Sequence, residues 1–268
     1  FSLPWTVWAL ESFSPVLTAT GRAVIAGALA VVVLTARRVP WPQRDQVKPI
    51  LYTMAGAVFG WPILIALALE RTTAAHAAVI AAVMPLVTAV IAVLRTHERV
   101  ARQFWIAAAC GTGALIVFAL LRGGGDGGNL VADLLIAGAV VASSWCYVEG
   151  ATLTRQMPGW QVISWVVIFA LPITVPASII IVATGGVVTP VTTQAWIGML
   201  MLRVVSVYFA FFAWYRGLAQ AGVARGAQTQ QLQAPLTLVW SALLLGEVIT
   251  IGTVIATVVV VACVAWAV

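Results

Sequence analysis

The chain has 268 residues, of which 62% are hydrophobic and only 8% are charged, and its mean hydropathy is +1.06. Soluble domains carry about 25% charged residues, so this composition excludes an ordinary soluble protein and indicates a polytopic membrane protein. The net charge of +6 does not indicate nucleic-acid binding, because the basic residues are dispersed between apolar segments instead of clustered on one surface.

About ten apolar segments follow one another, each near the ~20 residues that a membrane-spanning helix needs. The first, residues 1–10, is short, and we interpret it as the second half of a helix whose start is missing. The stretch GGGDGGN at 123–129 is the clearest linker, and it lacks the lysine of a phosphate-binding loop. The other predicted helices span residues 15–36, 50–69, 74–94, 104–121, 130–148, 160–183, 195–215, 223–245 and 248–268.

Basic residues favour one side of the membrane when the loops between these helices are alternated. That side receives ten basic residues, while the other side receives only Arg71 and Arg122. Arg44 and Lys48 are among the ten, in a predicted basic loop. Because basic loops stay in the cytoplasm, this bias predicts that both natural termini are cytoplasmic.

A shift of 149 residues aligns the two halves of the chain, pairing for example Thr88 with Thr237 and Glu98 with Glu247. The predicted repeats cover 1–122 and 130–268, with five helices each. An odd number of helices requires the second repeat to be inverted in the membrane, and inverted repeats place a substrate site at their interface. Chance alignment of helices rich in Ala, Leu and Val remains an alternative explanation of the match.

An amide-rich stretch at residues 222–247 indicates a helix that lines something wet, because amides in hydrocarbon need a partner or water. Helical spacing puts Gln230, Gln233 and Thr237 on one face and Gln228 with Gln231 on nearly the opposite face. We expect Gln230 and Gln233 to face a cavity. Bonds between helices are the alternative for either set.

Prolines inside apolar helices are predicted hinges, since proline removes a backbone donor. They are Pro62, in the sequence Gly-Trp-Pro, and the nearly repeat-matched pair Pro85 and Pro235. Three cysteines lie in apolar runs without metal-ligand spacing, so we expect buried small residues, no metal site and no cofactor: Cys110, Cys146 and Cys263.

Several other polar or aromatic residues lie inside predicted helices. Arg203 is expected to contact a substrate carboxylate or a gate, or else to pair structurally, because an isolated guanidinium in hydrocarbon is expensive. Glu149, near a predicted helix end, is expected to be solvated, with proton coupling as the alternative; His76 is either hydrogen-bonded or a proton relay. Tyr208 belongs to an aromatic stripe that packs or lines a binding wall. Ser144, Trp145 and Tyr147 are further candidates for substrate-binding residues that line the cavity.

Longer stretches resemble the drug/metabolite transporter superfamily, specifically its ten-helix EamA-type exporters. The stretches are FSLPWTVWALE near the start, ALALERTTAAHAAVIAAVMPLVTAVIAVLRTHE, and FFAWYRGLAQAGVARGAQTQQLQAPLTLVWSALLLGE with its final Leu-Gly-Glu. Arg22 matches an arginine typical of the family's second helix, for which a structural or gating role is implied. The sequence around Cys146 is similar to that of YddG-like amino-acid exporters, although Ala142 stands where those proteins have tryptophan.

The resemblance implies an all-α membrane protein whose central cavity is lined by helices 1, 3, 4, 6, 8 and 9, with Trp5 among the lining residues. We predict export of small metabolites, most readily amino acids, by alternating access across the cytoplasmic (inner) membrane of a bacterium. The lipid bilayer and a small-molecule substrate are the expected partners, and a monomer suffices. Alternatives are a drug or nucleotide-sugar carrier, a passive channel, or an intramembrane enzyme, although the sequence shows no catalytic cluster.

Overall fold

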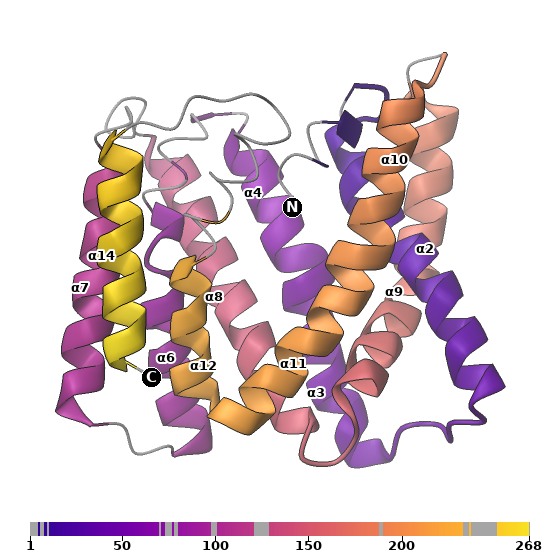
Figure 1. Cartoon of the computed structure of the whole chain (residues 1–268). Helices are drawn as coiled ribbons and strands as arrows, with labels where there is room; N and C mark the ends of the chain where they lie inside the picture. The colour runs from indigo at the N-terminus through magenta and orange to yellow at the C-terminus, as the bar shows by residue number, and fades with distance from the viewer. Residues whose placement is uncertain are drawn as a thin grey trace. The chain divides into compact units, whose positions relative to one another are not determined.

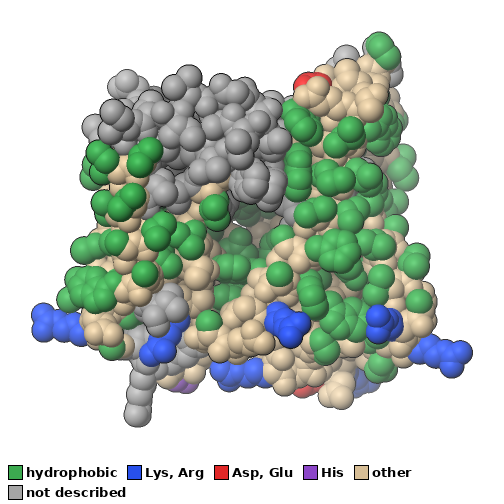
Figure 2. Space-filling view, viewed as in Figure 1, with side chains coloured by type: hydrophobic (Ala, Val, Ile, Leu, Met, Phe, Trp, Pro, Cys, Tyr) green, Lys and Arg blue, Asp and Glu red, His purple; other side chains and the backbone are tan. Residues whose placement is uncertain are grey.

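The computed structural model describes residues 5, 8–9, 11–69, 71–72, 77, 80–97, 101–120, 129–187, 190–232, 236 and 251–267 (Figure 1). This part of the chain is helical, with one isolated bridge that pairs Phe13 with Val187. Among these residues, four helices are long and apolar enough to cross a membrane: Val16–Ala36, Arg44–Ile65, Leu130–Leu153 and Gly159–Ala183. In Figure 2 the hydrophobic side chains cover the length of the helices, and Lys and Arg lie near helix ends.

The chain divides into two compact units, and each takes helices from both sides of the Gly-rich stretch. Unit 1 comprises Phe1–Phe59 and Glu149–Arg216, and unit 2 comprises Gly60–Val148 and Gly217–Val268.

In unit 1, α2 packs along α9, and the two come close because Gly27 has no side chain where Leu171 of α9 approaches. The helix α3 also packs on α9, while α10 and the π-helical segment η3 pack on α2. The elements of this unit are α2 (Pro15–Ala36), α3 (Arg44–Met54), the π-helical η1 (Ala55–Gly60, ending in unit 2), α9 (Gly159–Ala183), α10 (Thr193–Met201), η3 (Leu202–Phe209) and the start of α11 (Ala210–Ala221).

In unit 2, α7 packs along α14, and α6 packs against α12. The short 3₁₀ segment η4 contacts α6, α7 and α14. The elements of this unit are α4 (Trp61–Leu69), α6 (Met84–Thr96), α7 (Arg102–Ala119), most of α8 (Leu130–Leu153), α12 (Val223–Gln228), η4 (Thr229–Leu232) and α14 (Ile251–Ala267).

Three described helices begin at the 149-residue offset of the predicted repeats. The helices α3, α4 and α7 begin 149 residues before α10, α11 and α14 respectively. The two π-helical segments, η1 and η3, also end 149 residues apart, at Gly60 and Phe209. Each π segment therefore interrupts the same helix of its repeat. The pairs α2 with α9 and α7 with α14, which pack on each other, are also repeat-related.

The predicted basic loop is too long, because Arg44 and Lys48 belong to α3. This helix begins at Arg44 with a capping box, in which the backbone N–H of Gln43 donates to the side chain of Gln46 at 2.9 Å. Charged residues extend the helix beyond its apolar stretch, so hydropathy placed its start six residues too late, at residue 50.

The predicted helices at 74–94 and 223–245 are not continuous α-helices. A turn at Ala82 and Val83 precedes α6, and α12 gives way to η4 after Gln228. The helix predicted at 130–148 runs on to Leu153. The cysteine prediction is also partly wrong, because Cys146 is buried but Cys110 is exposed.

Candidate functional site

Two interruptions of the α-helical backbone, η3 and η4, contain polar residues. The π segment η3 contains Arg203 and Tyr208, and the 3₁₀ segment η4 contains Gln230 and Gln231. Such interruptions leave backbone groups that α-helical bonding does not satisfy, and they recur at functional sites. These segments therefore supply candidate functional residues, and each segment is described within its own unit.

Gln228 and Gln231 form a buried amide pair at the junction of α12 and η4. Their relative exposures are 0% and 1%, and the Gln231 amide nitrogen donates to the Gln228 side-chain oxygen at 2.7 Å. The same nitrogen lies 3.5 Å from the carbonyl oxygen of Ala108 in α7. A carbonyl can only accept, so this contact fixes which end of the Gln231 amide is nitrogen. The alternative expectation of bonds between helices is confirmed for this face.

Gly111 of α7 makes room for this pair. A Cβ atom at Gly111 would collide with Oε1 of Gln231, whereas a Cβ atom at Gly113, half a turn further along, would meet nothing within 4 Å. After the two bonds, Nε2 of Gln228 and Oε1 of Gln231 have no hydrogen-bond partner in the structure. The pair is thus tightly packed and only partly satisfied.

Gln230 is not part of that pair. The residue is partly buried, but both polar atoms of its amide are buried and have no hydrogen-bond partner. A buried amide without a partner costs about 1–3 kcal/mol. Among the described residues of α12 and η4, Gln230 is therefore the glutamine whose amide lacks a partner at both polar atoms.

A hydroxyl pair joins α6 to α8 close to Pro85. Thr88 Oγ1 lies 3.0 Å from Oγ of Ser144 and 2.8 Å from the carbonyl oxygen of Met84. Both residues have 0% relative exposure. Ser144 of α8 thus forms a hydrogen bond with Thr88 of α6 in this structure. Tyr147, on the next turn of α8, is partly buried.

Tyr208 is held by a hydrogen bond within unit 1. Its hydroxyl lies 2.8 Å from Oγ of Ser164 in α9, and its relative exposure is 5%. The bond fixes the ring of a residue in η3 against α9, as expected of an aromatic stripe that packs. Arg203 lies five residues earlier in the same π segment; its backbone is described but its side chain is not.

Glu149 is buried, with 1% relative exposure, so the expectation of a solvated carboxylate is wrong. The reason is that α8 continues to Leu153, which leaves Glu149 a full turn inside the helix. The ring of Tyr215 also packs beside it, where a Cβ on Gly150 would collide with that ring. Trp145, predicted on the same face, is 40% exposed.

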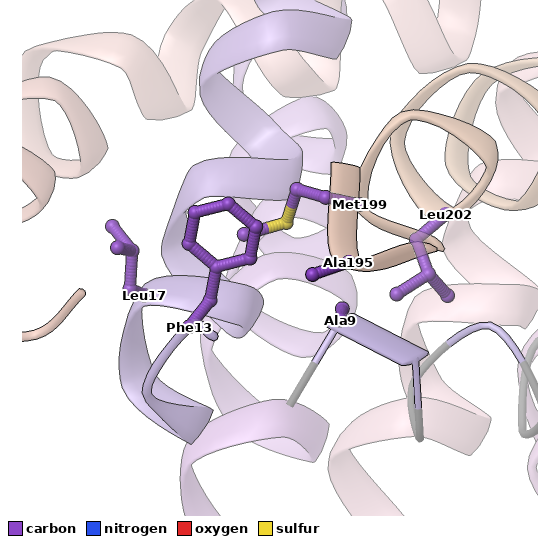
Figure 3. Close-up of a cluster of buried hydrophobic side chains, with 6 residues drawn as sticks. All are labelled: Ala9, Phe13, Leu17, Ala195, Met199 and Leu202. Atoms are coloured by element: carbon purple, nitrogen blue, oxygen red, sulfur yellow. The ribbon is translucent and has the colours of Figure 1, made fainter. Parts of the chain in front are cut away.

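Trp5 is partly buried against an apolar cluster in unit 1. The buried members come from the start of α2, the residues before it, and α10 with the first residue of η3 (Figure 3): Ala9, Phe13, Leu17, Ala195, Met199 and Leu202. Oγ1 of Thr192 donates to the carboxylate of Glu11 at 3.1 Å beside this cluster. Trp5 therefore takes part in the packing of unit 1.

The described predicted hinges lie next to the interruptions. Pro62 is the second residue of α4, directly after η1, and Pro85 lies in the first turn of α6, directly after the turn at Val83. His76, Gln233 and Pro235 lie outside the described residues, and of Arg22 only the backbone in α2 is described.

Sequence reasoning missed Gly111, Thr88 and Ser164, which position the polar residues. The available signal for Gly111 was a glycine inside an apolar helix, because a glycine there leaves room for a side chain of a neighbouring helix. Within the described residues, no group of three His, Cys, Asp or Glu side chains is arranged to hold a metal ion.

Comparison of the chain with known proteins shows that it is similar to transporters. The EamA-like transporter family matches residues 1–120 and 130–268. The "Uncharacterized transporter YdeK" of Bacillus subtilis (strain 168) is 36% identical over 264 residues, which cover 98% of this chain and 91% of that protein. A protein of known crystal structure aligns with a TM-score of 0.78 and 20% identity over 99% of this chain and 94% of the other, a similarity of fold.

Proposed function

Since the chain belongs to the EamA-like transporter family, we propose that it exports small metabolites, and amino acids in the first place. The chain is an all-α polytopic membrane protein of that family, consistent with ten spans. The proposed location is the cytoplasmic (inner) membrane of a bacterium, with both natural termini in the cytoplasm. The ten-to-two distribution of basic residues supports this orientation.

The observation that carries the proposal is the coincidence of polar side chains with interrupted helices. Irregular backbone at membrane depth is tolerated where it is buried in protein or lines a water-filled cavity. Transporters place substrate sites at discontinuous helices. Gln230 in η4 fits this role, because its buried amide offers a donor and an acceptor that nothing in the structure engages.

For the mechanism, we propose alternating access between two inverted repeats, residues 1–122 and 130–268, joined by the linker at 123–129. The family match to 1–120 and 130–268 and the 149-residue offset of the helices support a duplicated chain. Pro62 and Pro85 adjoin interruptions and suit hinge roles. Gln230, Gln233 and Arg203 are proposed to contact the substrate.

Arg203 is proposed to hold the carboxylate of an amino-acid substrate, because a guanidinium forms bidentate bonds with a carboxylate. Its position in η3 supports this role. Glu149 is proposed as a proton-coupling residue, because it is a carboxylate buried inside α8. His76 is retained as a second coupling candidate.

The direct test is flux into proteoliposomes that contain the purified chain. A panel of labelled amino acids would be offered with and without a pH gradient. The proposal predicts saturable uptake of at least one amino acid and accelerated exchange when the same unlabelled compound is inside. No flux of any amino acid would reject this substrate class, and flux of a drug or nucleotide sugar would replace it. Flux without saturation or exchange would indicate a channel.

A further inference from the structure

The loop between α2 and α3 holds an exposed tryptophan in a fixed position. Arg38 adopts a left-handed backbone conformation, with φ of 50°, and its N–H donates to the Thr35 carbonyl oxygen at 3.1 Å. Val39 N–H donates to the Leu34 carbonyl oxygen at 3.0 Å. Trp41 then lies between two prolines, whose rings restrict the backbone. The loop is therefore ordered by its own sequence.

The ring of Trp41 packs on α9 and yet remains largely exposed. Its centroid lies 4.9 Å from that of Trp165, in an edge-to-face arrangement, and 5.5 Å from that of Phe169. Trp165 has 5% relative exposure, but Trp41 has 66%. The contacts with α9 thus fix the indole while most of its surface points outward.

Exposed basic residues precede and follow this tryptophan in the chain. The loop and the first turns of α3 carry four exposed basic residues and one acidic residue, Asp45. Lys48 Nζ lies 5.8 Å from the ring centroid of Tyr52. Arg216, also exposed, belongs to the same end of unit 1, because its backbone lies beside Gly159 at the start of α9. The four basic residues are Arg37, Arg38, Arg44 and Lys48.

We propose that this site, formed by Trp41 and those four basic residues, binds the headgroup of an anionic phospholipid. The loop joins two helices long enough to cross the membrane, and Trp41 packs on the first half of a third. It therefore lies at the ends of spanning helices, which is the depth of lipid headgroups. Guanidinium groups bind phosphate, and indole rings settle at the headgroup level.

The other end of unit 1 offers a contrast. Trp196 is 53% exposed and also packs edge-to-face on an aromatic ring, that of Phe13, at 5.3 Å. The residues before it, 184–192, carry no charge. Glu11 adds a negative charge through its bond with Thr192. Both ends of unit 1 thus have an exposed tryptophan, but of the two, Trp41 is the one with basic residues next to it in the chain.

Native mass spectrometry of the purified chain in detergent tests the proposal. The probes are a phosphatidylglycerol and a phosphatidylcholine with the same acyl chains, added in equal amounts. We expect retention of the anionic lipid over the zwitterionic one. The double variant Arg37→Gln/Arg38→Gln should weaken that preference about 25-fold, at about fivefold for each basic residue. Trp41→Phe keeps the packing and should weaken retention of both lipids, whereas Trp196→Phe should change neither.

Three results would overturn the proposal. The first is equal retention of the two lipids by the unmodified chain. The second is an unchanged preference in the Arg37→Gln/Arg38→Gln variant, which alters only exposed side chains and leaves the packed ring of Trp41 in place. The third is displacement of the lipid by inorganic phosphate at equal concentration, which would show that the site binds free phosphate.

Discussion

The segments α3–η1–α4 and α10–η3–α11 have the same backbone plan, an α-helix that passes through a π segment and continues as an α-helix, but they differ in polarity. The sequence of η1 is AGAVFG, and the 149-residue offset aligns it with VVSVYF in η3. Arg203 aligns with Met54, and Tyr208 with Phe59. The π geometry therefore does not depend on polar residues. Of the two predicted repeats, residues 1–122 (the first copy) and 130–268 (the second copy), only the second has polar residues at these aligned positions.

The next helix of each copy shows the same contrast. The turn at Ala82 and Val83 aligns with Gln231 and Leu232 of η4, and Val79 aligns with Gln228. Gln228, Gln230, Gln231 and Gln233 of the second copy align with apolar residues of the first: Val79, Ala81, Ala82 and Met84. This difference provides matched substitutions, since replacing a residue of one copy by its counterpart in the other changes polarity at a shared backbone position.

The largest effect is expected for Arg203→Met, which gives η3 the residue of the first copy. If Arg203 holds a substrate carboxylate, its loss should lower transport roughly tenfold to a hundredfold, because bonds to charged groups contribute about 1.5–3 kcal/mol. Initial rates in proteoliposomes measure this. Unchanged transport would show that Arg203 is structural.

Gly111→Ala should destabilise the chain by about 1–3 kcal/mol, because the new methyl group would displace the Gln231 side chain. Gly113→Ala is the control, with open space around the added Cβ, and should change stability by less than about 0.5 kcal/mol. The stability of both variants is measured by denaturation in mixed micelles, monitored as the loss of the helical circular dichroism signal. Equal effects of the two substitutions would contradict the placement of Gln231 against α7.

Gln231→Ala should lower stability by about 1 kcal/mol, because it leaves the buried Gln228 amide without its partner. The double variant Gln228→Val/Gln231→Ala reproduces the residues of the first copy and should recover most of that loss, since removal of both partners is nearly neutral. A double-mutant cycle gives the coupling. Additive losses would mean that the two amides do not interact.

Thr88→Val should have the smallest effect, about 0.6 kcal/mol, which is typical of a hydrogen bond between membrane helices. Thr53 provides the control, because its buried hydroxyl donates within its own helix, to the Pro49 carbonyl oxygen at 2.9 Å. The same unfolding assay compares Thr88→Val with Thr53→Val. A larger loss for Thr53→Val would contradict a role for Thr88 in joining α6 to α8.

Hydropathy was sufficient to predict the helices whose ends coincide with the ends of their apolar stretches. The range predicted for α2, 15–36, matches the structure, and the start of α9 was predicted within one residue. It failed at the start of α3, where charged residues continue the helix. The π and 3₁₀ segments could not be predicted from hydropathy, because their sequences are as apolar or as helix-compatible as their surroundings and packing determines their backbone.

Burial of individual polar residues was harder to predict than the helices. Gln228 and Gln231, which helical spacing placed on one face, form a hydrogen-bonded pair in the structure. The partner of that pair did not follow, since it depends on Gly111 and Ala108 in a helix more than a hundred residues earlier. Glu149 was expected to be solvated because the predicted helix stopped one residue before it.

The central claim is that the polarity added to the second copy serves transport. Gln230→Ala tests it most directly, because it replaces a buried amide that makes no hydrogen bond in the structure by alanine, which the first copy has at the equivalent Ala81. With the amino acid that the flux panel identifies, initial uptake by this variant should be about tenfold slower, as expected for one lost hydrogen bond, while stability is unchanged or increased. Uptake at the unmodified rate would contradict the claim.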